Sequence, residues 1–396
     1  MLINNFFMIT LLVFLIILSL LVFVHELGHF AVARKFGIRV DEFGLGFPPR
    51  AFGVYKDEHG KWIKVAGNKQ VENVPGTLYS LNWVPLGGFV KIKGENGEDS
   101  EAKDSFASKK IWKRISVLTA GVTMNVILAG VLLSIGLMIG LPQVLDEEKT
   151  NTLTIKDPKI QVVEVIADSP ATVAGIEPGD SIIAINNEDV FGITKINEIV
   201  VENADKEIPI VIKRGDDELQ KIITPGNIDG KEGAFMGVSL VETGTVSYPW
   251  YKAIIEGFIL AVVLLKAIIM AFYTIIRDLI IGTTVETDIA GPIGIAVLTG
   301  QVVKMGFIYV LQFAALLSLN LAIINFLPIP ALDGGRVFFL IIEKIRGKAL
   351  NARIENIIHT TGFVFLMLLV VLVTFRDVSK FGNVFAGLWG KITGLF

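Results

Sequence analysis

Four uncharged apolar stretches constrain the fold of this chain more than any other feature. They cover residues 6–24, 115–141, 306–327 and 357–375. A hydrocarbon core about 30 Å thick is crossed by about 20 residues of helix, so each stretch is long enough to span a membrane. The first stretch has no Lys or Arg before it and is longer than the apolar part of a signal peptide, so we expect a retained span. The sequence therefore predicts four transmembrane helices.

Composition agrees with a membrane protein and excludes several functions. Hydrophobic residues make up 52% of the chain and charged residues 19%, whereas soluble proteins carry about 25% charge. The formal net charge of −3 provides no basic field, so we expect no nucleic-acid partner. The chain has no cysteine, which excludes disulfides, thiolate zinc sites and thiol nucleophiles.

A fifth apolar stretch, residues 252–278, contains charged positions. Its polar residues fall within about 100° of one another on a helical wheel, which is typical of an amphipathic helix on a membrane surface or against other helices. A lipid-facing span is disfavoured because one lysine would lie near its middle. We expect this helix not to cross. The polar residues are Lys252, Glu256, Lys266, Tyr273 and Arg277.

The distribution of basic residues predicts the orientation. Residues 34–114 contain fifteen Lys or Arg, and four more lie between residues 344 and 353. Basic loops next to spans remain in the cytoplasm, so both segments are expected there. Both chain termini and residues 142–305 are then extracytoplasmic, and the segment between the second and third spans must cross the membrane zero or two times.

The sequence HELGH at residues 25–29 is the strongest chemical motif. On a helix, His25 and His29 lie on one face and can bind one zinc ion, while Glu26 lies beside a water on that metal and can take its proton. The alternative is a chance pattern in which two histidines serve packing. Ionisable residues at the end of an apolar span are expensive and usually functional, which favours the catalytic site.

A third metal ligand is expected, because catalytic zinc sites usually have three protein ligands. His59 and His359 are the other histidines, and neither is part of a motif. Asp333 follows two closely spaced prolines in NFLPIPALDGG, residues 325–335, where a regular helix cannot continue. An ordinary turn after a span is the alternative. However, the first and third spans run in the same direction, so Asp333 and the HELGH motif fall at their inner ends and can meet.

These two motifs together resemble the site-2 protease family, peptidase M50, and most closely its bacterial regulator of sigma-E protease (RseP) group. The resemblance covers nearly the whole chain. It implies an intramembrane zinc endopeptidase that cleaves transmembrane segments. The other segments that carry it are GLGF at 44–47, PLGGFV at 85–90, SPA at 169–171 with AGIEPGD at 174–180, and GPIGI at 291–295.

The resemblance also implies roles for individual residues. His25, His29 and Asp333 would bind one Zn²⁺ per chain, and Glu26 would be the general base. Asn325 matches a position that helps to hold the substrate or the oxyanion, although a polar residue satisfied between helices is the alternative.

Three further residues, Gly87, Gly88 and Phe89, lie in the segment that resembles the family's membrane-associated β-loop. This loop could pair with an extended substrate, and a plain cytoplasmic hairpin is the alternative.

Two features depart from the family pattern. In AGVTMN, residues 120–125, the family often has proline after the glycine, so the role of Asn125 stays open between function and packing. Only one PDZ-like module fits between the second and third spans, whereas some relatives carry two. That module could bind a newly exposed C-terminus of the substrate or act as a size filter, or it could be a spacer.

The expected fold is a multi-pass α-helical membrane protein with four transmembrane helices, a membrane-associated β-loop and an inserted extracytoplasmic PDZ-like α+β domain. The expected location is the bacterial cytoplasmic membrane, with the active site towards the cytoplasmic face. Expected partners are the lipid bilayer and single-span membrane protein substrates, such as anti-sigma factors or remnant signal peptides.

The expected segments are 1–33 (first span), 34–114 (cytoplasmic, β-loop at about 78–94), 115–141 (second span), 142–245 (PDZ-like), 246–305 (amphipathic), 306–335 (third span and the Asp333 motif), 336–356 (cytoplasmic loop), 357–375 (fourth span) and 376–396 (extracytoplasmic tail).

Two other classes of function compete with the peptidase. A non-catalytic scaffold would display the PDZ-like module, but it would not need Glu26. A transporter would use His, Asp and Asn as a coordination site, but it predicts inverted repeats, and none is found between the two halves of the chain.

Overall fold

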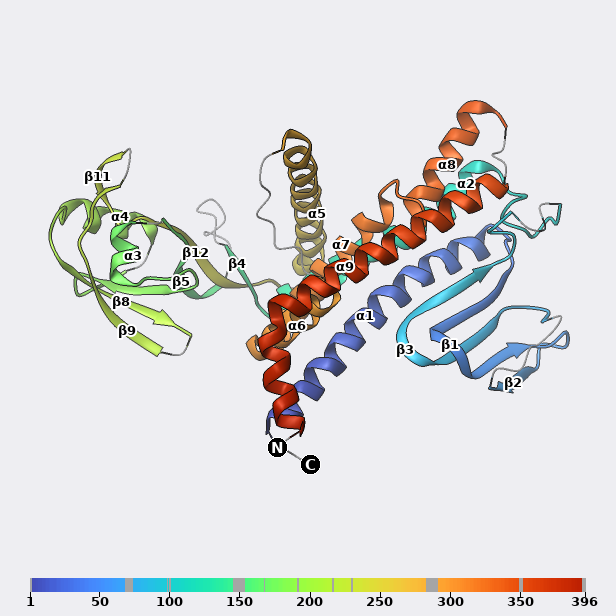
Figure 1. The fold of residues 1–396 in the computed structure, drawn as a ribbon, viewed down its shortest axis with the longest axis horizontal. Helices are drawn as coiled ribbons and strands as arrows, with labels where there is room; N and C mark the ends of the chain where they lie inside the picture. Colours follow the sequence, from blue (N-terminus) through green and yellow to red (C-terminus); the bar gives the residue numbers. More distant parts are fainter. Residues whose placement is uncertain are drawn as a thin grey trace. The chain divides into compact units, whose positions relative to one another are not determined.

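The computed structural model divides the chain into two compact units, which are described separately (Figure 1). Unit 1 combines Met1–Ile135 with Ile254–Phe396, and unit 2 is Gly136–Ala253. The structure describes residues 2–67, 74–97, 99, 101–144, 154–166, 168–190, 192–215, 217–228, 231–282, 291–348 and 352–393.

Unit 1 is mainly helical. Within the described residues, five helices are long and apolar enough to cross a membrane, one more than the four predicted. The additional one is α5, and only 6% of its most apolar stretch is buried within the protein. That this helix does not cross the membrane stays a prediction. Helix α8 lies where a loop was expected, and α9 continues to Thr393 instead of ending at residue 375. The helices are α1 (Leu2–Lys35), α2 (Ile111–Ile139), α5 (Trp250–Ile281), α6 (Pro292–Met305), α7 (Phe307–Phe326), α8 (Asp333–Arg346) and α9 (Ala352–Thr393).

Small residues let α2 approach its neighbours closely. A Cβ at Gly28 of α1 would lie closer than 3.0 Å to the carbonyl of Ala120 in α2. A Cβ at Gly257 of α5 would likewise meet Ser134 of α2, whose hydroxyl donates to the Ile254 carbonyl at 3.3 Å. Helices in lipid pack through small residues and hydrogen bonds, because lipid provides little hydrophobic driving force between them.

A sheet of three described strands lies beside α1 (Figure 1). Its order is β2 (Trp62–Ala66), β1 (Val40–Lys56), β3 (Leu78–Ile92). The first half of β3 pairs with two parts of β1, whereas its second half, residues 88–92, pairs with β1 on one side only. Gly87 has a φ of +68°, and a Cβ there would collide with Val22 of α1. Ser19 of α1 donates to the Pro85 carbonyl at 2.9 Å. The predicted β-loop is therefore a bent strand held against the helix that carries the HELGH motif.

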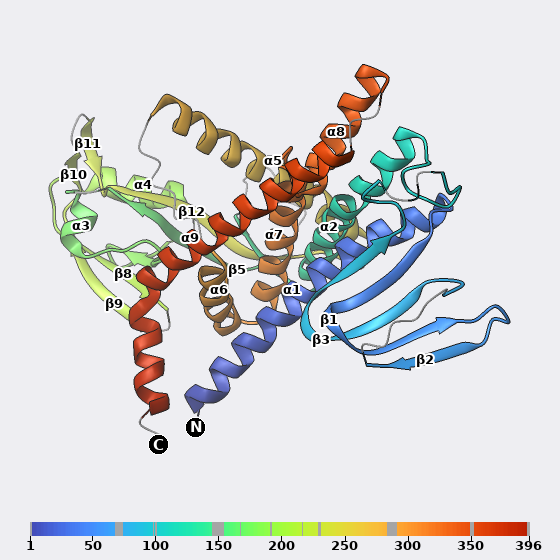
Figure 2. The ribbon, with the colours of Figure 1, turned by 45° about the vertical axis from the view of Figure 1, so that its right-hand side comes forward.

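The amino terminus of α6 is capped by a carboxylate from another helix. Asp377 of α9 is 3% exposed and accepts hydrogen bonds from the backbone N–H groups of Gly291 and Gly294, at 3.2 and 2.7 Å. A side chain at Gly291 would collide with this carboxylate. The first N–H groups of a helix have no partner within it, so Asp377 satisfies two of them and complements the helix dipole. Figure 2 shows α9 extending from the region of α8 past α6.

Unit 2 is an α+β module built around one sheet. The strand order is β4-β12-β5-β6-β8-β9, with β7 paired to β6. The elements are β4 (Leu141–Val144), β5 (Thr154–Val165), α3 (Pro170–Ala174), β6 (Ser181–Ile185), β7 (Glu188–Asp189), α4 (Ile193–Glu202), β8 (Ile208–Arg214), β9 (Asp217–Ile223), β10 (Gly226–Ile228), β11 (Lys231–Phe235) and β12 (Val238–Ser247).

The apolar core of unit 2 explains this arrangement. Alternate residues of β8, Ile208, Ile210 and Ile212, are buried on the face that α4 covers with Ile196 and Ile199. This period of two along the strand, opposite a helix with apolar residues three apart, is typical of a half-buried sheet against an amphipathic helix.

A buried ion pair holds the turn before β6 in unit 2. Asp180 is 1% exposed and accepts two hydrogen bonds from Arg214, at 2.7 and 2.9 Å, and one from the Glu177 N–H at 2.9 Å. Burial alone would raise the pKa of Asp180, but the hydrogen bonds from Arg214 and Glu177 outweigh it and hold this pKa below its ordinary value. The unfolded chain therefore binds the proton more readily than the folded one.

We expect Asp180→Ala to lower the free energy of unfolding of unit 2 by about 1.5–3 kcal/mol, the usual range for hydrogen bonds to a charged group. The stabilisation in the wild type is complete above the ordinary Asp pKa of about 4 and is lost as pH falls through the lower pKa of the folded state. Hydrogen exchange of the full-length protein at pH 7 and below pH 4 measures both effects. Asp189→Ala, at an exposed position, is the control, and equal exchange in the two variants would contradict the expectation.

Candidate metal centre

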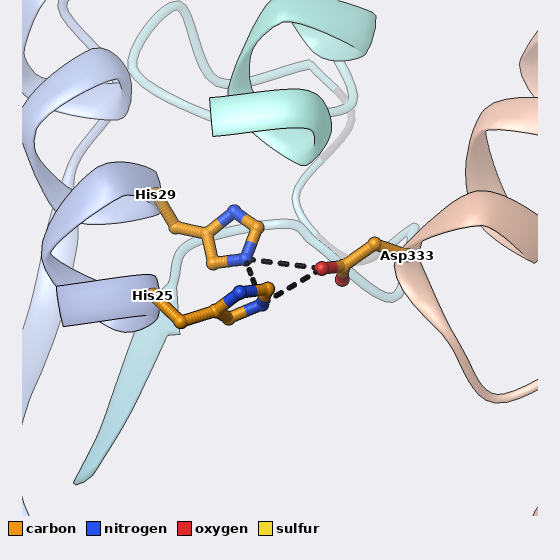
Figure 3. Close-up of side chains that lie close together, drawn as sticks. All are labelled: His25, His29 and Asp333. Atoms are coloured by element: carbon orange, nitrogen blue, oxygen red, sulfur yellow. Dashed lines mark hydrogen bonds and ion pairs between the residues drawn. The ribbon is translucent and has the colours of Figure 1, made fainter. Parts of the chain in front are cut away.

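Three side chains from two distant parts of the chain converge in unit 1 (Figure 3). The Nε2 atoms of His25 and His29 lie 3.1 Å apart. Oδ2 of Asp333 lies 3.0 Å from His25 Nε2 and 3.3 Å from His29 Nε2. Both histidines are 6% exposed, and the Asp333 side chain is 23% exposed. The sequence predicted this group of three, and the structure brings these residues together.

Helix α1 presents the two histidines on one side, towards α2. His29 Nδ1 lies 2.8 Å from the carbonyl oxygen of Val117, so Nδ1 carries the proton and Nε2 keeps its lone pair. His25 Nδ1 lies 3.2 Å from the side-chain amide of Asn125, which is fully buried. Metal-binding histidines are usually oriented by a hydrogen bond that the second ring N–H donates, as His29 donates to the Val117 carbonyl. The same arrangement at His25 requires the Asn125 amide to present its oxygen, instead of its nitrogen, to Nδ1.

The two glycines after Asp333 explain how this residue reaches the histidines. Helix α7 ends at Phe326, and the chain turns through two prolines before Asp333 begins α8. A Cβ at Gly334 would collide with the Phe326 carbonyl, and one at Gly335 would collide with the Ile329 carbonyl. The loop therefore folds directly over the first turn of α8, which only glycine permits.

The three donor atoms fit a zinc ion. Ligands about 2.0–2.1 Å from a tetrahedral ion lie about 3.3 Å from one another, close to the three separations found here. Gly121 of α2 leaves the space open, because a Cβ there would lie closer than 3.0 Å to Nε2 of both histidines. Two imidazole nitrogens and one carboxylate are also a common donor set of catalytic zinc sites, which keep a fourth position open.

Glu26 lies between the two histidines in sequence and faces the sheet. Its carboxyl group is close enough to the backbone of Val90 in β3, to Asp333 and to Glu95 for these groups to act on it electrostatically. Glu95 in turn forms an ion pair with Arg336 of α8. The carboxyl group thus lies close to Asp333 and to the strand that was predicted to pair with the substrate.

The other predicted site residues lie on α7 and β3. Asn325 is half-buried on the last turn of α7. Gly87 and Gly88 are buried where β3 meets α1, and the ring of Phe89 covers Gly44 of β1. The structure therefore places Gly87 and Gly88 against Val22 and Phe23 of α1.

Sequence reasoning missed the contribution of α2 to the site. Val117, Gly121 and Asn125 lie four residues apart and contact the histidines from one face of this helix. The spacing of four residues between them was the signal in the sequence from which this contribution could have been predicted. A packing role seemed equally plausible for Asn125. In the structure its side-chain amide also contacts His25.

A helix that carries HExxH within an apolar span, joined by a carboxylate from a second helix, defines a membrane-embedded metallopeptidase. The model of peptidase family M50 matches residues 13–66 and 69–369. The chain belongs to this family, the site-2 proteases, and is a zinc-dependent intramembrane metalloendopeptidase with several membrane-spanning helices.

Individual relatives are similar along their whole lengths. Zinc metalloprotease RasP of Bacillus licheniformis is 32% identical over 455 residues, which cover 94% of this chain and 99% of that protein. The regulator of sigma-W protease RasP of Bacillus subtilis strain 168 is 32% identical, with coverage of 94% and 98%. Among solved structures, the PDZ domain of the SdrC-like protein of Listeria monocytogenes matches 22% of this chain and 92% of that chain, with 23% identity and a TM-score of 0.21.

Proposed function

We propose that His25, His29 and Asp333 bind one zinc ion per chain and that Glu26 is the general base for hydrolysis of a peptide bond within a transmembrane segment. The observation that carries this proposal is the convergence of three donor atoms 3.0–3.3 Å apart, next to the HELGH glutamate. When bound, zinc supplies a Lewis acid and lowers the pKa of water towards neutrality. Glu26 accepts the proton of the attacking water and delivers it to the leaving amine.

The substrate of this reaction is proposed to be the helix of a single-span membrane protein, such as an anti-sigma factor or a remnant signal peptide. A helix hides its peptide groups in its own hydrogen bonds, so it must unwind before cleavage. Strand β3 supports this step because its second half, residues 88–92, pairs with β1 on one side only and begins against α1 just before His25. An unwound segment could pair with this edge, and the Asn325 amide could hold the substrate or donate to the oxyanion.

The metal centre is proposed to face the cytoplasm, with unit 2 and both chain termini on the other side of the membrane. Basic residues support this orientation, because Arg34 and Lys35 end α1, and Lys344 and Arg346 end α8. Unit 2, the PDZ-like module, would then meet the extracytoplasmic part of the substrate, either by binding a C-terminus or by excluding large ectodomains.

Cleavage of a single-span reporter helix by the purified protein tests the proposed function. We expect one zinc ion per chain by elemental analysis, a cut within the span, and loss of the cut after treatment with a zinc chelator, restored by added zinc. A scaffold would neither bind zinc nor cut the reporter. A transporter would bind an ion without cutting. A protein free of bound zinc that leaves several reporter helices uncut would overturn the assignment of the three ligands.

A further inference from the structure

Helix α9 contacts the loop that presents Asp333. The backbone N–H of Ala331 donates to Nδ1 of His359 at 2.9 Å. One turn later, a Cβ at Gly362 would lie closer than 3.0 Å to the Pro330 carbonyl. His359 and Gly362 thus lie on one face of α9, and the backbone of this helix packs directly onto the loop.

The loop needs this contact because its conformation is unfavourable. Ala331 has a φ of +79°, in the left-handed region that a residue with a Cβ rarely adopts. The neighbouring N–H groups of Ile329 and Leu332 donate to carbonyls within the loop, at Leu327 and Ile329. The Ala331 N–H donates instead to the ring of His359, so α9 supplies the acceptor that this conformation requires.

The ring of His359 is held in place. It makes an edge-to-face contact with Phe339 of α8, with ring centroids 5.3 Å apart. It also lines a cavity of about 560 Å³ together with Arg336 and Glu95. Because the ring borders this open space, a smaller side chain at position 359 can be accommodated without a collision.

Only Leu332 separates Ala331 from Asp333, so the backbone at Ala331 sets where the Asp333 carboxylate points. We propose that His359 is a positioning residue: by accepting the Ala331 N–H, it fixes the loop so that Asp333 reaches the two histidines. The inference rests on the proposed zinc ligation by Asp333. We therefore expect metal binding to depend more on a hydrogen-bond acceptor at position 359 than on the size of the side chain there.

Three substitutions at this position separate the acceptor from the bulk of the side chain. Asn places its Oδ1 where Nδ1 of histidine lies along the side chain, Gln moves the acceptor one bond further out, and Leu removes it. Thr360→Ala, on the next residue of α9 and in the same cavity, is the matched control. Zinc dissociation constants are measured on the metal-free full-length protein by competition with a chelator, and kcat and KM with the reporter helix.

We expect His359→Leu to weaken zinc binding about tenfold or more and to lower kcat, with KM unchanged, since partners that orient metal ligands typically contribute 10–100-fold in affinity. His359→Asn should retain zinc affinity within about threefold, and His359→Gln should resemble the Leu variant. Wild-type zinc affinity in His359→Leu would overturn the proposal. Where the Leu variant fails to fold, equal zinc affinities of the Asn and Gln variants would overturn it. A wild-type protein that binds no zinc would instead refute the proposed function.

Discussion

Glu26→Gln is expected to reduce kcat for the reporter helix by about 10³-fold while leaving zinc bound. An amide is similar in shape to a carboxylate, so His25 and His29 keep their positions, but it cannot accept the proton of the attacking water. General-base catalysis typically contributes 10²–10⁴-fold, which sets the expected size of the loss. Single-turnover cleavage and elemental analysis on the same preparation measure the two quantities.

Glu198→Gln is the control for this substitution, because Glu198 is exposed on α4 of unit 2. It should cleave at the wild-type rate. A Glu26→Gln variant that retains zinc and cleaves within tenfold of the wild type would show that another group takes the proton. Loss of zinc together with activity would mean that Glu26 supports the metal ligands and would leave its role as base without support.

Gly121→Ala is expected to prevent zinc binding and so to abolish cleavage. The new Cβ would lie closer than 3.0 Å to Nε2 of both His25 and His29, in the space that the ion needs. The substitution should at the same time favour the helix, because alanine has a helix propensity about 1 kcal/mol better than glycine. The expected result is therefore a protein of normal or raised thermal stability with less than a tenth of the wild-type zinc content.

Gly300→Ala provides the matched control for this effect. Gly300 is also a helical glycine that faces α1, but its nearest neighbour is the side chain of Thr10, at 3.2 Å, and no metal ligand is near it. This variant should bind zinc and cleave like the wild type. Normal zinc content in Gly121→Ala would mean that α2 can move away from the histidines, which its close packing at Gly28 argues against.

The sequence was sufficient to predict that His25, His29 and Asp333 come together, because the signals that mark them are local. His25 and His29 share a helix face by spacing alone, and the prolines before Asp333 mark a break near the end of a span. The residues of α2 that orient the histidines were not predicted, because which face of α2 meets α1 depends on packing between helices. The link from His359 to Ala331 joins residues 28 positions apart and has no sequence motif.

The limits of the fold prediction have similar physical causes. Apolar length identified α1, α2, α7 and α9, since crossing a bilayer requires it. Helix α5 is equally long and apolar, but Lys266 and its other polar residues favoured a surface helix. Helix α8 was expected to be loop because it is short and amphipathic, and it is stabilised by tertiary contacts such as the ion pair between Glu343 and Arg114.

Helix α9 has a fixed polar contact near each end of its apolar part. His359 holds the Asp333 loop, and Asp377, eighteen residues later, holds the first turn of α6. At 1.5 Å per residue these contacts are about 27 Å apart, close to the ~30 Å thickness of a hydrocarbon core. The helix can neither slide nor tilt freely without breaking one of them. A thinner or thicker bilayer must therefore be accommodated either by the lipid around α9 or by strain at one of these two contacts. Through the second route, the acyl-chain length of the membrane becomes a physical variable for the geometry of the loop that carries Asp333.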